Sequence, residues 1–271
     1  MGAHYDHIPP HLVEWILKQH IFYVASAPLK ADGHVNVSPK GYQASFRLVD
    51  KNKVWYEDLT GSGAETASHV RENGRITIMF VSYDGAPNIV RLFGVGKVHE
   101  FGSEGYTALL PDAQRQPGSR AIIEIEVYKV GTVRRFSSCG YGIPCFKFDH
   151  DRNVLEQWAV KREAADIIAE DSSSPEQQSD KGIRSYWASA NHTSLDGLPA
   201  IKGASGAQSR IQHKEPTITG KPKIERVKAP LALQPAASPL SWLQTNAGWL
   251  LPVSFAAGVV AASVYQRMAA R

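Results

Sequence analysis

Seven short segments rich in Val, Ile, Phe and Tyr dominate the first half of the chain, and they limit its fold more than any other feature. They lie at residues 21–25, 34–38, 45–48, 54–58, 75–81, 88–98 and 121–133. Turn-forming clusters such as Ala31-Asp32-Gly33 and Tyr83-Asp84-Gly85 separate them, as expected between strands. Short strands at this spacing form a barrel or a sandwich.

Helical patterns flank these strands, which favours a β-barrel over a sandwich. Pro10 opens a short amphipathic helix that carries Leu12, Val13 and Ile16, since proline is tolerated in the first turn. Further helices are predicted at about residues 64–73, 103–110 and 152–170. The chain has 271 residues, 43% of them hydrophobic, which is ordinary for a globular protein. We predict a mainly β fold with flanking helices, a barrel domain that covers residues 1–200.

The charge of the chain is unevenly distributed. The net charge of +4 arises from −3 over residues 1–200, +5 over 201–246 and +2 over 247–271. A nucleic-acid-binding body would carry its basic residues in the folded part, so no nucleic-acid partner is predicted. The first twenty residues contain prolines, charges and histidines rather than an apolar run, so no signal peptide is predicted either.

Composition changes twice near the C-terminus. Residues 201–239 are rich in Gly, Ser, Ala, Lys and Pro, which favours a flexible basic linker. Residues 247–265 carry no charge, and nineteen helical residues span roughly the thickness of a bilayer's hydrocarbon core. We predict a C-terminal tail anchor at 240–271, which would place a cytosolic body on an intracellular membrane; the sequence does not say which one. The alternative is a hydrophobic helix that packs on the barrel.

A strand, a glycine-rich turn and a helix follow one another at residues 55–69. Thr60 or Ser62 is placed to cap the helix, with Glu65 three residues after Ser62 as in a capping box. Free N–H groups at a helix start, approached through Gly61, also suit a phosphate. Capping alone explains the same residues. Lys40, which follows Ser38 at the end of another predicted strand, adds a cation suited to a phosphate, or is a solvated turn lysine.

Several ordered motifs together resemble the flavin-binding split-barrel proteins of the pyridoxamine 5′-phosphate oxidase-like superfamily. Residues 138–144 and 191–199 are similar to a less studied branch of it. The motifs that carry the general resemblance are 36–41, 58–69, 73–80 and 89–98. The match covers roughly residues 12–200. Any one of these motifs by itself would be unspecific.

The resemblance implies a homodimer of split barrels that holds FMN in a cleft between the subunits. Carried onto this chain, the flavin phosphate would be held by Lys40 and by four residues of the turn and helix start: Thr60, Gly61, Ser62 and Thr66. Ser38 would lie beside them. Arg91 is a second contact to phosphate or ring, or equally a surface charge on the sheet.

The implied function is that of a membrane-tethered, FMN-dependent oxidoreductase acting on a small molecule. FMN brings its own redox chemistry and needs no protein nucleophile, and no catalytic residue, substrate or electron donor can be named. The C-terminal arginine and histidine segment of pyridoxamine phosphate oxidases proper has no clear counterpart, so oxidation of vitamin B6 is not predicted. Alternatives are a non-catalytic flavin- or haem-binding or tethering module and a deazaflavin-dependent reductase.

The sequence gives weaker evidence for a metal site or a reactive thiol than for a phosphate site. His4, His7 and His11 lie near the N-terminus, where solvated side chains are the better interpretation than metal ligands. Cys139 and Cys145 are the only cysteines, and we interpret them as inert thiols rather than a redox pair. We predict no metal site.

Overall fold

The computed structural model describes residues 3–132, 140–170 and 180–203. The chain divides into two units, Met1–Pro222 and Lys223–Arg271, and every described residue belongs to the first. Within the described residues, no helix is both long and apolar enough to cross a membrane. The predicted span at 247–265 lies outside the described residues, so it stays a prediction.

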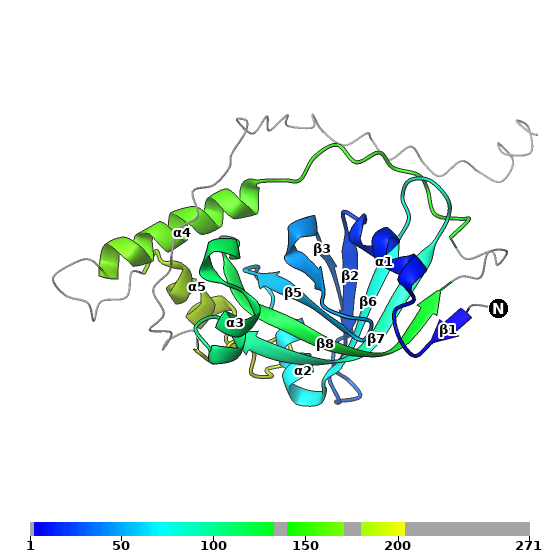
Figure 1. Ribbon diagram of the computed structural model, residues 1–271. Coiled ribbons are helices and arrows are strands. Elements are labelled where there is room, and N and C mark those ends of the chain that lie inside the picture. Colours follow the sequence, from blue (N-terminus) through cyan, green and yellow to red (C-terminus); the bar gives the residue numbers. More distant parts are fainter. Residues whose placement is uncertain (1–2, 133–139, 171–179, 204–271) are drawn as a thin grey trace, which may run out of the picture. The chain divides into compact units, whose positions relative to one another are not determined.

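One antiparallel sheet of eight strands makes up the body (Figure 1). Its strand order is β3-β2-β6-β7-β8-β5-β4, and β1 pairs with the end of β8. All seven predicted strands are present, with small shifts at their ends, and β1 is an addition. The strands are β1 (Ala3–Tyr5), β2 (Phe22–Ser26), β3 (Asn36–Lys40), β4 (Phe46–Leu48), β5 (Lys53–Leu59), β6 (Arg75–Val81), β7 (Ile89–Glu100) and β8 (Ser119–Thr132).

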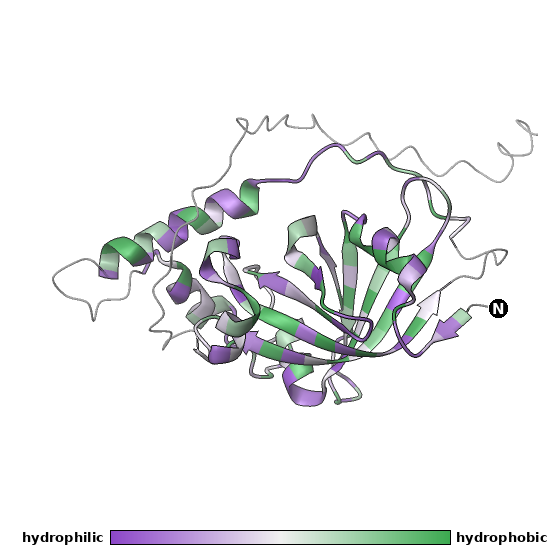
Figure 2. Cartoon of the chain, viewed as in Figure 1, coloured by the Kyte–Doolittle hydropathy of each residue, from purple (hydrophilic) through white to green (hydrophobic). Residues whose placement is uncertain are grey.

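The inner face of the sheet carries an unbroken apolar row. Val24, Ile78, Leu92 and Val130 are register partners across β2, β6, β7 and β8, and each is fully buried. Paired residues of antiparallel strands point to the same face. The alternation of green and purple along the strands in Figure 2 reflects this inner and outer pattern.

Aromatic packing curls the sheet into a half-barrel. The ring of Phe22 on β2 lies 5.3 Å from the ring of Phe46 on β4 and 5.5 Å from that of Tyr56 on β5. Phe46 also packs edge-on against Phe80 of β6 at 5.2 Å. These strands belong to opposite ends of the strand order, so their contact requires the sheet to fold back on itself. The mainly β, barrel-like prediction is confirmed to this extent.

In the described residues five α-helices flank the sheet, and four of them were predicted. They are α1 (Pro10–Leu17), α2 (Glu65–Asn73), α3 (Glu104–Leu109), α4 (Val154–Glu170) and α5 (Ile183–Ala190), with short 3₁₀ turns at Gln43–Ser45 and Asp112–Gln114. The sequence analysis missed α5. Its Trp187 is buried against a second apolar cluster that includes Trp55 and Ile122. The N-cap of α5 is Gly182, which makes no side-chain capping hydrogen bond, so no start signal like the proline of α1 marks it in the sequence.

The helical layer is joined to the sheet by buried carboxylates. Glu163 of α4 accepts a hydrogen bond from Arg115 at 2.6 Å and another from the Gly118 N–H at 2.8 Å. Asp166 of α4 accepts from the N–H of Ile183 at 2.9 Å, which satisfies a free donor at the start of α5. Sequence periodicity predicts α4 but not these contacts.

The folded body continues past the predicted boundary at residue 200. Ile201 is buried, and the N–H of Lys202 donates to Glu100 at 2.9 Å. The predicted start of the linker at 201 is therefore too early by at least three residues, up to Gly203, whose N–H also reaches Glu100. We call residues 191–203 the C-terminal clamp, because they bind the side of α2.

Candidate phosphate site at the split of the barrel

An ion-pair network closes the gap between β3 and β5. Lys40 Nζ lies 3.0 Å from Asp58 Oδ1, and Arg120 Nε lies 2.9 Å from Asp58 Oδ2. Strand β3 is the first strand of the sheet and β5 is the last but one, so this network joins edges that backbone pairing leaves apart. Its formal charge is +1.

A β-bulge brings Arg120 to this network. Asp58 pairs with Ala121, whereas Leu59 pairs with Ser119, so Arg120 is the extra residue on β8. A bulge changes the direction in which the side chain of its extra residue points. Arg120 also donates to the carbonyl oxygens of Gly61 and Gly63, at 3.3 and 2.8 Å, and so holds the glycine-rich turn against the sheet.

Asp58 is buried and ionised. Burial by itself would raise the pKa of its carboxyl, but the charges and hydrogen bonds of Arg120 and Lys40 lower that pKa to about 2. The side chain of Lys40 keeps 21% of its surface exposed, against 1% for Asp58. Lys40 is therefore the member of the network that faces solvent, and its ammonium has donors beyond the one that Asp58 uses.

A chain of polar side chains runs from β3 to the start of α2. Ser38 Oγ donates to Asn36 Oδ1 at 2.9 Å, and Asn36 Nδ2 donates to Thr66 Oγ1 at 3.0 Å. The structure thus brings the predicted residues Ser38 and Thr66 together with Lys40 on one side of β3. Tyr56 adds a buried hydroxyl that makes no hydrogen bond within the described residues.

The turn before α2 is only in part available to a ligand. Thr60 Oγ1 donates to the Gly118 carbonyl at 2.6 Å and accepts from Trp187 Nε1 at 2.7 Å. It is buried, so its predicted role in holding a phosphate does not agree with its contacts. Gly61 contributes a carbonyl that Arg120 and Asn191 already occupy. Ser62 is exposed.

The predicted capping of α2 is wrong. The helix begins after Ala64, whose side chain makes no capping hydrogen bond, and neither Thr60 nor Ser62 takes that place. The Glu65 carboxylate accepts instead from the Leu195 N–H at 3.3 Å. The reason is tertiary: the C-terminal clamp supplies a donor that the local sequence does not show. The first-turn N–H groups of α2 are left without an intrahelical partner.

Arg91 does not join this cluster within the chain. The register row of Lys40 runs through Phe22 and Phe80 to Val90, so Arg91, the next residue, points to the opposite face. It is exposed there. Three strand spacings of about 4.8 Å also separate β7 from β3, roughly 14 Å in all. Within this chain Arg91 is a surface charge, and its contact to the phosphate or ring of a flavin stays a prediction.

The C-terminal clamp holds the far side of α2. Asp196 accepts from the His34 backbone N–H at 3.0 Å and contacts His34 Nδ1 at 2.7 Å. His69 of α2 is buried and contacts Ser26 Oγ through Nδ1 at 3.0 Å, while its Nε2 lies 3.9 Å from Asp196. Ser68 donates to the Leu198 carbonyl at 3.1 Å. The motif at 191–199 therefore positions the helix rather than the phosphate directly.

Four members of the cluster were not predicted as site residues: Asn36, Tyr56, Asp58 and Arg120. Asn36 and Asp58 lie inside motifs that the sequence analysis quoted, next to residues that it chose. Arg120 is separated from Asp58 by 62 positions, and only the bulge brings the two together. In the described part of the chain, no group of three or more His, Cys, Asp or Glu side chains lies close enough to hold a metal ion.

These features define a class of protein, a curled antiparallel half-barrel with a net positive polar cluster across its split. A family model described as pyridoxamine 5′-phosphate oxidase matches residues 8–134. The pyridoxamine 5′-phosphate oxidase family protein ustO of Aspergillus flavus is 36% identical over 209 residues, which is 75% of this chain and 80% of ustO. The chain belongs to the pyridoxamine 5′-phosphate oxidase family.

Solved structures resemble part of the body. HupZ of Group A Streptococcus is 27% identical and covers 45% of this chain and 91% of its own, with a TM-score of 0.38. An FMN-binding protein from Syntrophomonas wolfei is 9% identical and covers 46% of this chain and 84% of its own, with a TM-score of 0.34. Both similarities extend over less than half of this chain.

Asp58→Asn tests the network through its pH dependence. The lowered pKa of Asp58 contributes stability that is complete above the pKa of an unfolded aspartate and is lost as the pH falls toward about 2. We expect the substitution to lower the free energy of unfolding by about 3 kcal/mol at pH 7, and by about 2 kcal/mol less near pH 2. Urea unfolding at both pH values measures this.

Asp32→Asn is the matched control, because Asp32 is an exposed partner of Lys30 and surface pairs contribute about 0–1 kcal/mol. A loss from Asp58→Asn that is equal at the two pH values would contradict the assigned ion pairs.

Proposed function

We propose that this chain binds FMN through its phosphate at the split of the barrel and uses it as an oxidoreductase of small molecules. The observation that carries the proposal is the partly exposed Lys40, which shares Asp58 with Arg120, while Arg120 also holds the glycine-rich turn that leads into α2. Membership of the pyridoxamine 5′-phosphate oxidase family supports a flavin.

The residues present fit a phosphate in most respects. Lys40 supplies a solvent-facing cation, Ser62 supplies an exposed hydroxyl, and the first-turn N–H groups of α2 supply oriented donors. The O–H of Ser38 already donates to Asn36, so Ser38 orients Asn36. Thr66 is bonded to Asn36, so it orients β3 against α2. Thr60 has both of its hydrogen-bonding roles filled; we assign it to the support of the turn.

Asp58 sets the strength of this site. The Asp58 carboxylate is paired with the Lys40 ammonium and would compete with a phosphate for it. Arg120 compensates the carboxylate from the other side, which leaves the ammonium free to contact a second anion. When bound, FMN supplies hydride and electron transfer itself, so the chain's part is to hold the phosphate and orient the ring.

A homodimer is part of the proposal. The outer face of β3, β2, β6 and β7 carries a register row of Val37, Ala25, Thr77 and Phe93, and Val37 is 61% exposed. An apolar outer face of this kind suits a second copy of the chain, and Arg91 lies on the same face. Sedimentation equilibrium tests the dimer, and a monomer at all concentrations would exclude it.

FMN binding and the role of Lys40 are tested together. We expect wild-type protein to quench flavin fluorescence on titration, and Lys40→Ala to weaken FMN binding by about 1–3 kcal/mol because it removes a charge-assisted contact. Lys51→Ala, at an exposed turn, is the matched control. An unchanged dissociation constant for Lys40→Ala would remove Lys40 from the site, and a wild type that takes up no FMN would overturn the flavin proposal.

Reduction and reoxidation of the bound flavin distinguish a catalytic flavoprotein from a protein that only binds the flavin. We expect NADH or NADPH to bleach the visible absorbance of the FMN-loaded protein without oxygen, and a suitable acceptor to restore it. If no acceptor gives turnover, the protein is a non-catalytic binding or tethering module. The visible spectrum of the purified protein also reports haem, and a preference for a deazaflavin over FMN would identify a deazaflavin-dependent reductase.

Membrane tethering through residues 240–271 is proposed on the uncharged stretch at 247–265. It would place the body on the cytosolic side of an intracellular membrane. We expect a fluorescent-protein fusion of the full chain to sediment with membranes, and the same fusion without residues 240–271 to remain in the supernatant. If the full-length protein stays in the supernatant, the membrane-anchor proposal is wrong.

A further inference from the structure

A hollow lies on the outer face of the sheet. Its lining includes Gly41 and Tyr42, which follow Lys40 in the chain, but no residue of the phosphate cluster itself. It has a volume of about 540 Å³, and its lining includes residues 146–148 and 150–152 together with Tyr23 of β2 and Tyr83 of the turn after β6. The Phe146 N–H donates to the Tyr83 carbonyl at 2.8 Å. Tyr23 forms part of its floor, and its neighbours Phe22 and Val24 face the core. Since side chains alternate along a strand, the hollow and Lys40 lie on opposite faces.

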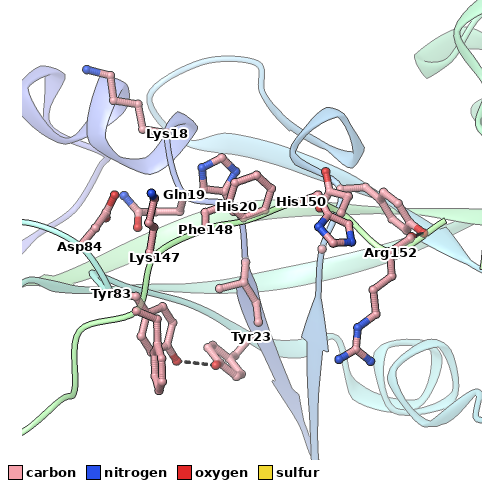
Figure 3. Close-up of a pocket in the computed structure, with 15 residues that line it drawn as sticks. Lys18, Gln19, His20, Tyr23, Tyr83, Asp84, Lys147, Phe148, His150 and Arg152 are labelled. Carbon is pink, nitrogen blue, oxygen red and sulfur yellow. Dashed lines mark hydrogen bonds between the residues drawn. The ribbon is translucent and has the colours of Figure 1, made fainter. Parts of the chain in front are cut away.

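Five of the fifteen residues that line this pocket are Tyr or Phe, and two more are His. Figure 3 shows the rings of His20 and Phe148 close together above the Tyr23–Tyr83 pair. The His20 and Phe148 rings are stacked, with centroids 3.7 Å apart and planes within 3°. Tyr83 packs against Phe146 at 5.6 Å. Flat walls of this kind select flat ligands, and the volume lies within the range of about 300–1,000 Å³ found for small-molecule sites.

Two phenol groups supply the polar edge of the pocket. The hydroxyl oxygens of Tyr23 and Tyr83 are 2.5 Å apart, as the dashed line in Figure 3 marks. Burial, with a contribution from the hydrogen bond to Tyr83, raises the pKa of Tyr23 to about 12, so this phenol stays protonated at neutral pH. One O–H of the pair is used between them, which leaves one O–H to donate to a ligand.

The charges around the pocket balance. Lys18 is paired with Glu14 at 2.6 Å. Of the other charged side chains in the lining, two are cations and two are anions: Lys147, Arg152, Asp84 and Asp151. Apart from the Lys18–Glu14 pair, the lining has no excess of either sign, so its charge does not favour a charged ligand over a neutral one. The pocket therefore differs in kind from the net positive cluster at Lys40.

We propose that this pocket binds a neutral, planar aromatic molecule of one or two fused rings that carries a hydrogen-bond acceptor, a carbonyl oxygen or a ring nitrogen, on one edge. The rings would lie against the aromatic walls, and the acceptor would receive the free O–H of the Tyr23–Tyr83 pair. The proposal does not depend on flavin binding, because the pocket shares no lining residue with the phosphate cluster.

Equilibrium dialysis of the full-length protein against three probes tests the two requirements separately. Coumarin is planar and has a carbonyl, naphthalene is planar without an acceptor, and octahydrocoumarin keeps the carbonyl but is not flat. We expect coumarin to bind most tightly. The double substitution Tyr23→Phe and Tyr83→Phe should weaken coumarin threefold to tenfold, about the range for one hydrogen bond, and leave naphthalene unchanged.

Two further variants complete the test. Phe148→Ala removes one wall and should weaken both planar probes, while Tyr128→Phe, on an exposed tyrosine of β8 outside the pocket, should weaken neither. Binding of coumarin no tighter than octahydrocoumarin, or equal binding by wild type and the double variant, would overturn the proposal. Saturating FMN should leave the coumarin dissociation constant unchanged; displacement would overturn the separate site and assign the pocket to the flavin ring.

Discussion

The body of this protein depends on one buried carboxylate. Asp58 lies between Lys40 and Arg120 and joins two strands that backbone hydrogen bonds leave apart. Apolar packing among Phe22, Phe46 and their neighbours also holds the sheet in its curled form. An ion pair with a buried carboxylate costs desolvation free energy and is retained where its geometry is needed. Here the geometry closes the split of the barrel and places a cation at its mouth.

The candidate site is a consequence of that closure. Lys40 contacts Asp58 of β5, and it follows Asn36 and Ser38 on β3, whose polar chain reaches Thr66 at the start of α2. The C-terminal clamp then holds α2 from its other side through Asp196 and Leu198. Segments more than a hundred residues apart thus fix one helix terminus. The clamp connects the site to the part of the chain that leads toward the basic C-terminal region.

The two faces of the sheet carry different chemistry. The inner face combines an apolar core with the net positive cluster, which suits an anionic group. The outer face carries exposed apolar side chains, Arg91 and the aromatic pocket around Tyr23 and Tyr83. Membership of the pyridoxamine 5′-phosphate oxidase family explains the shared barrel, but a fold hosts many functions. What this chain binds is therefore argued from its own residues on each face.

The sequence by itself determined the strands, four of the helices, the family and the positions of Ser38 and Lys40, because alternation, turn residues and motifs are local patterns. Tertiary structure decided the rest. Contacts with Gly118 and Trp187 use the hydroxyl of Thr60, and the strand register places Arg91 on the opposite face from Lys40. The predicted cap of α2 is absent, and a bulge in β8 brings Arg120 to Asp58. Each of these outcomes depends on register and on contacts between distant segments. A one-residue change in pairing reverses the face that a side chain occupies, and no local pattern records that choice.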